Sequence, residues 1–171
     1  DCIATLGCEQ YEMDAWGVDV TVGASQKGLM TPPGLGLVWA GERAWAAHRT
    51  ADLRTRYWDW TQRAMEGPQY LRFCGTPPVA HVFGFREALR MIDEEGIVLR
   101  WARHRALADA VRAAVTAWSS PGGVSLYANV PAGQGDPVTA IAAGGIDVRL
   151  LAEVCRDRCG VTLGVGLGDL E

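Results

Sequence analysis

Hydrophobic residues in the first fifty positions form short runs separated by turn residues, a pattern that predicts strands. Residues 19–24 are rich in β-branched side chains, and residues 35–40 form a second apolar run. Prolines and a glycine in residues 30–34 exclude regular structure between them. Residues 1–8 are typical of a strand end that turns into a loop, and residues 42–48 predict a helix.

The middle of the chain has a helical period. Residues 57–65 predict a helix with Asp59 as a possible N-cap, and residues 67–78 predict a loop. From residue 80 to 117 the apolar positions recur at helical spacing, which predicts two helices that meet near Gly96.

After a Ser-Ser-Pro-Gly-Gly turn at residues 119–123, the pattern changes to short strands around one helix. The predicted strands are 124–128, 139–143 and 160–165, and the helix is 147–159 with Asp147 as its cap. This change predicts two domains, residues 1–100 and residues 101–171, the second of which begins with the linking helix.

Composition and charge narrow the function classes. The chain is 49% hydrophobic and 21% charged, as in ordinary globular proteins, and its net charge of −4 comes without the basic tract of a nucleic-acid surface. No apolar run is long enough for a membrane span, and no signal peptide is visible. Five cysteines with no paired spacing and no histidine partner predict free thiols in a reducing cytoplasm and no metal site.

One lysine stands out from the cations. The 16 basic residues are 15 arginines and a single lysine, Lys27, which follows the first predicted strand. Arginine cannot replace lysine where a neutral primary amine must attack a carbonyl group. A partly desolvated lysine can form an imine, so we favour covalent chemistry at Lys27 over the alternative of an ordinary surface lysine.

A carboxylate completes the candidate site. An imine cofactor such as pyridoxal phosphate (PLP) withdraws electrons best when a carboxylate keeps its ring nitrogen protonated. Asp1 precedes an apolar stretch, and two neighbouring strands that end on one side would bring Asp1 and Lys27 to one pocket. The alternative role for such an aspartate is to cap a turn.

Several motifs in order then resemble a known family, the class V, fold-type I aminotransferases, above all the serine–glyoxylate and alanine–glyoxylate enzymes. They are Asp1-Cys-Ile-Ala-Thr-Leu-Gly, Met13-Asp-Ala-Trp-Gly-Val-Asp-Val, Ser25-Gln-Lys-Gly-Leu-Met-Thr-Pro-Pro-Gly, Tyr57-Trp-Asp-Trp and Cys74-Gly-Thr-Pro-Pro. Cysteine desulfurases of the same class usually have a histidine where Gln26 stands here.

The resemblance implies a role for each matching residue. Lys27 would hold PLP as a Schiff base and move the substrate's proton. Asp1 would face the pyridine nitrogen, Ile3 would pack on one face of the ring, and Gln26 would lie near the phosphate. Thr76 would reach the phosphate of the neighbouring subunit's cofactor, which implies a homodimer with shared active sites. Phe73 stands where a phosphate-binding tyrosine is often found.

The resemblance also implies an α/β fold. Residues 1–100 would be the C-terminal part of the PLP-binding large domain, and residues 101–171 the linking helix and an incomplete α+β small domain. The phosphate loop and a stacking aromatic residue would precede Asp1, and the substrate-binding arginine would follow Glu171. We therefore expect an internal fragment with little or no activity alone.

The implied reaction is transamination between a small amino acid, serine or alanine, and the 2-oxo acid glyoxylate. Alternatives are ureidoglycine–glyoxylate aminotransferase, another class V PLP enzyme, or a non-catalytic dimerisation module that keeps the fold.

Outside the site, we expect Trp58 and Trp60 in the core and Arg100, Arg103 and Arg105 on a solvated helix face.

Overall fold

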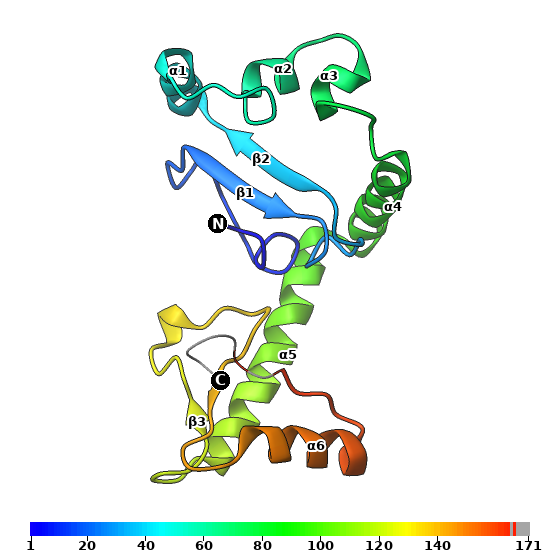
Figure 1. Ribbon diagram of the computed structural model, residues 1–171. Helices are drawn as coiled ribbons and strands as arrows, with labels where there is room; N and C mark the ends of the chain where they lie inside the picture. The colour runs from blue at the N-terminus through cyan, green and yellow to red at the C-terminus, as the bar shows by residue number, and fades with distance from the viewer. Residues whose placement is uncertain (165, 167–171) are drawn as a thin grey trace. The chain divides into compact units, whose positions relative to one another are not determined.

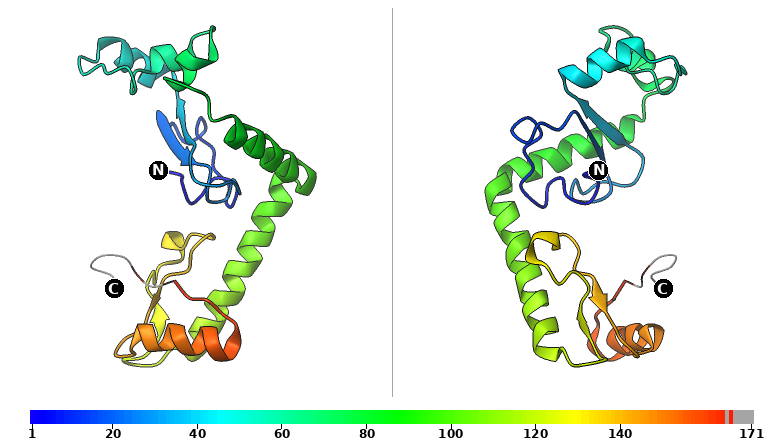
Figure 2. Two further views of the ribbon diagram at one scale, coloured as in Figure 1. Left: turned by 45° about the vertical axis from the view of Figure 1, so that its right-hand side comes forward. Right: turned by 90° about the vertical axis from the view of Figure 1, so that its left-hand side faces the viewer.

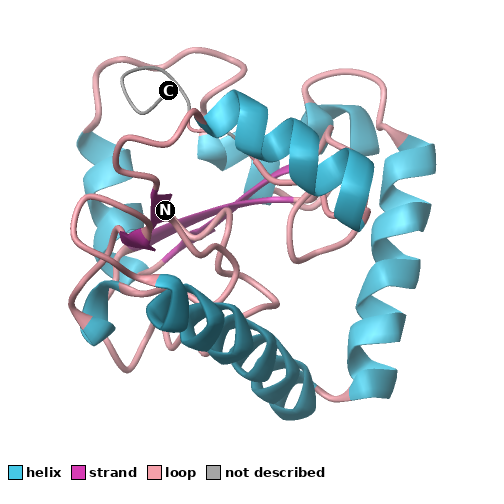
Figure 3. Cartoon of the chain, turned by 90° about the horizontal axis from the view of Figure 1, so that it is seen from below, coloured by secondary structure: helices cyan, strands magenta, loops and turns pink. Residues whose placement is uncertain are grey.

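The computed structural model describes residues 1–164 and 166, and the chain divides into two units, Asp1–His104 and Arg105–Glu171. The long helix α5 (Ile97–Trp118) begins in the first unit and continues into the second (Figure 1). Most of the regular structure is helical (Figure 3). Among the described residues, none of the helices combines the length and apolar character that a membrane span requires.

The first unit contains a two-stranded antiparallel sheet. Strand β1 (Val20–Ala24) pairs with β2 (Gly36–Ala40) in a register that sets Val22 opposite Val38, so both predicted strands are confirmed. Side chains alternate along β1, because Thr21 is buried while Val20 is exposed. The strand therefore presents one face to the interior of the unit.

Four helices follow in the first unit: α1 (Glu42–Thr50), α2 (Trp60–Ala64), α3 (Gln69–Phe73) and α4 (Val79–Glu95). The Asp59 side chain accepts a hydrogen bond from the Thr61 backbone N–H (2.9 Å), which confirms the predicted N-cap of α2. Gly96 separates α4 from α5 with a φ of 80°, which confirms that two helices meet there.

Three local predictions are wrong. Residues 1–8 form turns closed by internal hydrogen bonds and contain no strand. The short helix α3 lies inside the segment 67–78, which was predicted to be a loop. Residues 160–164 form no strand, because Gly160 ends the preceding helix in the left-handed conformation; residue 165 lies outside the described residues.

The second unit has a small two-stranded sheet and one further helix. Strands β3 (Ser125–Leu126) and β4 (Ile141–Ala142) pair antiparallel and are shorter than the predicted 124–128 and 139–143. A 3₁₀ turn, η1 (Pro131–Gly133), lies between them. Helix α6 (Val148–Cys159) begins after Asp147, whose side chain accepts from the backbone N–H groups of the second and third helical residues.

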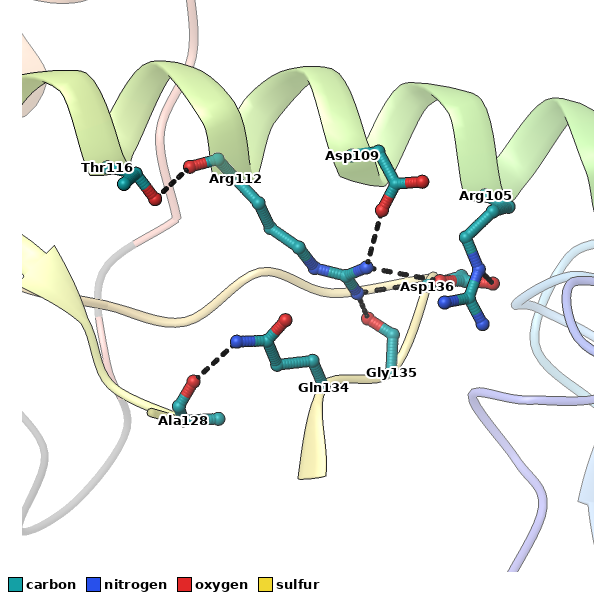
Figure 4. A network of polar contacts seen from close by, with 8 residues as sticks. All are labelled: Arg105, Asp109, Arg112, Thr116, Ala128, Gln134, Gly135 and Asp136. Atoms are coloured by element: carbon teal, nitrogen blue, oxygen red, sulfur yellow. Dashed lines mark hydrogen bonds and ion pairs between the residues drawn. The ribbon is translucent and has the colours of Figure 1, made fainter. Parts of the chain in front are cut away.

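A buried arginine joins α5 to the loop before β4 (Figure 4). Arg112 is 8% exposed and donates to the Gly135 carbonyl oxygen (2.7 Å), and its guanidinium pairs with Asp136 and Asp109. Arg105 also binds Asp136 (2.9 Å), although its own side chain is 59% exposed. Because a buried charge must be paired, this network fixes the loop on the helix.

The cap of α6 gives the first prediction. Asp147→Ala removes the acceptor of two backbone N–H groups and should lower the free energy of unfolding by about 1 kcal/mol. Asp157→Ala, on the exposed surface of the same helix, is the control and should change it by less than about 0.5 kcal/mol. Urea titration followed by circular dichroism measures both; equal losses would contradict the capping role.

Candidate active site

The turn that carries Lys27 is closed by Ser25, which is fully buried at the end of β1. The Ser25 carbonyl oxygen accepts from the backbone N–H and the hydroxyl of Thr31 (2.9 and 3.0 Å). The Ser25 hydroxyl donates to the Pro32 carbonyl oxygen (2.9 Å). We call residues 25–31 the lysine turn. Hydrogen bonds between Ser25 at its start and both Thr31 at its end and the next residue, Pro32, therefore fix the backbone of the lysine turn.

Lys27 itself projects from a fixed backbone. Its carbonyl oxygen accepts from the Met30 N–H (2.9 Å), and Leu29, in the same turn, is buried. The side chains of Lys27 and Gln26 are exposed, and among the described residues no hydrogen bond or ion pair engages the Lys27 ammonium group. The amine is therefore accessible, and its attachment point is well defined.

Asp1 begins a second turn segment, residues 1–8, which we call the aspartate turn. The Cys2 N–H donates to the Val22 carbonyl oxygen (2.9 Å), so this turn lies beside β1 (Figure 2). One carboxylate oxygen of Asp1 accepts from the Ile3 N–H (2.8 Å). The other oxygen has no hydrogen bond within the part of the chain that the structure describes. Ile3 is half-buried.

The two turns touch at Gly28. A Cβ atom at Gly28 would lie 2.3 Å from the Leu6 carbonyl oxygen and 2.6 Å from the Cys8 sulfur. Only glycine permits so close an approach of one backbone to another. Cys8 is buried there, and burial raises the pKa of its thiol. The residue after Lys27 therefore packs directly on the aspartate turn.

Arg100, in the first turn of α5, binds both turns at once. Its Nε donates to the Gly7 carbonyl oxygen (2.6 Å), and its Nη2 donates to the Gly28 carbonyl oxygen (2.8 Å). The residue is 4% exposed. The expected solvated face is therefore wrong for Arg100, whereas the Arg103 and Arg105 side chains are 48% and 59% exposed.

Arg100 was not among the predicted site residues, although its position on α5 carries a signal. The buried residues of α5 include Ala108, Arg112 and Val115, and Arg100 lies two helical turns before Ala108. Arg100 thus continues the buried face of the helix. A charged residue on such a face needs partners, and the glycine-rich turns supply them as backbone carbonyl groups.

Glu95 neutralises the buried guanidinium. Arg100 donates to one Glu95 oxygen (3.1 Å), and Arg103 donates to both (2.6 and 3.0 Å). Hydrogen bonds from Arg103, and then from Arg100, lower the pKa of Glu95 to about 2. The carboxylate is therefore charged at neutral pH and balances Arg100.

Thr76 lies between α3 and α4, and its side chain is exposed. No hydrogen bond among the described residues joins it to either turn. Phe73, at the expected tyrosine position, is the last residue of α3. Within one chain, therefore, the structure brings together the turns of Asp1, Ile3, Gln26 and Lys27 and does not add Thr76 to them.

His48, Asp59 and Trp60 form a cluster of their own. His48 lies 3.1 Å from Asp59 and stacks on Trp60, with an angle of 22° between the rings. Trp58 is 73% exposed, so its expected place in the core is wrong. Among the described residues, no group of three His, Cys, Asp or Glu side chains is arranged to hold a metal ion.

The ion pairs of Glu95 predict a pH dependence. Because the pKa of Glu95 falls from 4.5 to about 2 on folding, the stability it contributes is present above pH 4.5 and disappears as the pH falls towards 2. Glu95→Gln should therefore be less stable than the wild type at pH 7, with a difference that shrinks between pH 4.5 and 2. Unfolding curves at several pH values test this, and a constant difference would contradict it.

Comparison with known proteins provides the context for this site. The sequence model of the family "Aminotransferase class-V" matches residues 1–168. Serine–glyoxylate aminotransferase of Methylorubrum extorquens is 35% identical, and L-aspartate–glyoxylate aminotransferase of Paracoccus denitrificans is 36% identical; each match covers 99% of this chain and 42% of the relative.

A solved structure agrees with these matches. Pyridoxamine–pyruvate aminotransferase from Mesorhizobium loti superposes with a TM-score of 0.82 at 30% identity, over 99% of this chain and 43% of that one. The fold is accordingly the α/β fold of the fold-type I aminotransferases. The chain spans less than half the length of these relatives.

Proposed function

This chain belongs to the class-V aminotransferase family, and we propose that the whole protein transfers an amino group from an amino acid to a 2-oxo acid, with PLP bound covalently to Lys27. The observation that supports this most directly is the junction of the two turns. The only lysine follows the end of β1, and the turn that begins with Asp1 packs on the next residue, Gly28.

The donor set fits PLP chemically. Lys27 offers a primary amine for the aldehyde, and Asp1 has a carboxylate oxygen with no partner among the described residues. Gln26 adds an exposed amide for the phosphate, and the half-buried Ile3 an apolar surface for the ring. When bound, PLP supplies electron withdrawal from the substrate's Cα.

The protein's own groups then have distinct tasks. Lys27 Nζ would hold the cofactor, and the same amine would take the proton from the substrate's Cα. The negative charge of Asp1 favours a proton on the ring nitrogen. The hydrogen bond from the Ile3 N–H keeps the carboxylate on its turn (2.8 Å).

We propose glyoxylate as the acceptor and serine or alanine as the donor. The two relatives at 35% and 36% identity are named for glyoxylate, and they differ in the donor, serine in one and aspartate in the other. Assay of the whole protein with serine, alanine, aspartate and ureidoglycine would identify the donor. A failure to use glyoxylate with any donor would contradict the acceptor.

A homodimer is the second part of the proposal. Thr76 is exposed and makes no hydrogen bond to either turn among the described residues, as expected if it serves the site of a neighbouring subunit.

A cytoplasmic location stays a prediction, supported by cysteines that are all free. The assignment of the two units to a large and a small domain also stays a prediction. We further propose that the 171-residue chain alone is a poor catalyst, since it spans less than half the length of its relatives.

Lys27 gives the sharpest functional prediction. Borohydride reduction of the PLP-saturated protein should leave a pyridoxyl group on Lys27, and peptide mass spectrometry can locate it. Lys27→Arg keeps the charge, lacks the reactive amine, and should lose the adduct together with about 10²–10⁴-fold of the transamination rate. A folded wild-type protein without the adduct would support a non-catalytic module and contradict the proposal.

Thr76→Ala should weaken PLP binding about tenfold or more, because a hydrogen bond to a charged group is worth about 1.5–3 kcal/mol. Thr50→Ala is the matched control, since among the described residues its hydroxyl bonds the Ala47 carbonyl oxygen and neither turn, and it should bind PLP normally.

Mixed dimers locate Thr76. Subunits with Lys27→Arg, refolded together with subunits with Thr76→Ala, should regain one site of wild-type affinity per heterodimer. This follows because a shared site takes its lysine from one chain and its threonine from the other. No recovery in a verified heterodimer would place Thr76 at its own subunit's site and refute sharing.

A further inference from the structure

The buried residue Arg100 has no part in the reaction proposed above, yet it contacts both turns of the candidate site. Its guanidinium donates to Gly7 of the aspartate turn and to Gly28 of the lysine turn (2.6 and 2.8 Å). We propose that Arg100 is a positioning residue for the PLP site, one that sets the spacing between Asp1 and Lys27. The inference rests on the proposed function.

The geometry of the guanidinium suits this task. Arginine offers donors in a rigid planar fork, so two acceptors bound by one guanidinium have a fixed separation. Nε and Nη2 bind the two turns, and Nη1 binds Glu95 (3.1 Å). Lysine has a point-like ammonium group on a flexible stem and would not fix two carbonyl groups in the same way.

Neither acceptor has much freedom to move. Gly7 has a left-handed φ of 81°, and a Cβ there would lie 2.9 Å from the Gly28 carbonyl oxygen. Gly28 in turn packs against Leu6 and Cys8. The two glycines allow the turns to meet, and Arg100 holds the carbonyl groups of both. A shift of the guanidinium would therefore move Lys27 relative to Asp1.

The charge of Arg100 keeps it in place. At 4% exposure the guanidinium is almost fully out of water, and such a charge is stable only with a counter-charge and hydrogen bonds. Glu95 supplies the counter-charge, and Arg103 holds Glu95 from the solvent side with a side chain that is 48% exposed. Arg103 has no hydrogen bond to either turn among the described residues. It is therefore a matched control, because it shares Glu95 with Arg100 but lacks the carbonyl contacts.

The test compares Arg100→Met with Arg103→Met in the whole protein. In the cofactor-free form, hydrogen exchange of the peptides covering residues 1–9 and 25–31 should accelerate at least about tenfold in Arg100→Met, which corresponds to about 1.4 kcal/mol of local opening. In the PLP-bound form, the Kd for PLP should rise about tenfold, and the pH midpoint of the cofactor's visible absorbance should shift. Arg103→Met should leave the exchange rates and the Kd for PLP within about twofold of the wild type, and the pH midpoint of the absorbance unshifted.

Arg100→Lys is a second variant, to be used if Arg100→Met does not fold. It keeps the positive charge for Glu95 and loses the fork, so it should show the same changes to a smaller degree. Exchange, PLP affinity and absorbance midpoint that all match the wild type in a folded Arg100→Met or Arg100→Lys protein would overturn the inference. Equal effects of Arg100→Met and Arg103→Met would overturn it too, because they would show loss of the ion-pair network alone.

The two proposals fail in different ways. If borohydride leaves no pyridoxyl group on Lys27 of the wild-type protein, the proposed function fails whatever Arg100 does. If that adduct forms and the Arg100 variants behave as the wild type, only the positioning role fails.

Discussion

One buried guanidinium holds together the two turns that carry the proposed cofactor-binding residues. Arg100 binds a carbonyl group on each of two turns, and each turn carries one of the candidate cofactor-binding groups. Neither turn is part of a strand or helix, and the Cys2 N–H bond to the Val22 carbonyl oxygen joins only the start of the aspartate turn to β1 among the described residues. The constraint comes from the first turn of α5 and from an ion pair with Glu95 that the low pKa of that carboxyl group keeps charged.

Other arginines of this chain also donate to backbone carbonyl oxygens, which gives a reason for the many arginines in the sequence. Arg112 binds the Gly135 carbonyl oxygen from α5, and Arg63 binds the carbonyl oxygens of Arg72 and Tyr57. Each of these arginines uses several donors to tie a loop to a neighbouring segment, a role that suits a rigid fork and not an ammonium group. Among these cations the one lysine differs, because among the described residues no hydrogen bond or ion pair engages its ammonium group.

Much of the fold was predictable because it depends on local patterns. The β-branched run of β1, the caps of α2 and α6, and the break at Gly96 each follow from residues close together in sequence. The two strand predictions that are wrong, at residues 1–8 and 160–164, also have local causes. Hydrogen bonds within residues 1–8 form turns in place of a strand, and the left-handed Gly160 ends α6 before a strand can begin.

The sequence proposes the residues of the candidate site, but it does not identify the contacts that position them. Lys27 and Asp1 can be recognised from composition and motif, since each carries a chemical group with a specific use. Arg100 is 72 positions from Gly28 and 93 from Gly7, and its contacts depend on how α5 packs. A pattern of helical spacing predicts that a face is buried, and it does not identify the carbonyl groups that the face meets.

A crystal structure of the whole protein grown with PLP would show whether Lys27 and Asp1 belong to one cofactor site. We expect electron density that is continuous from Lys27 Nζ to the cofactor, with the Asp1 carboxylate at the ring nitrogen and the Arg100 guanidinium still between the two turns. A cofactor bound elsewhere, or bound to Lys27 with Asp1 turned away from the ring, would contradict it.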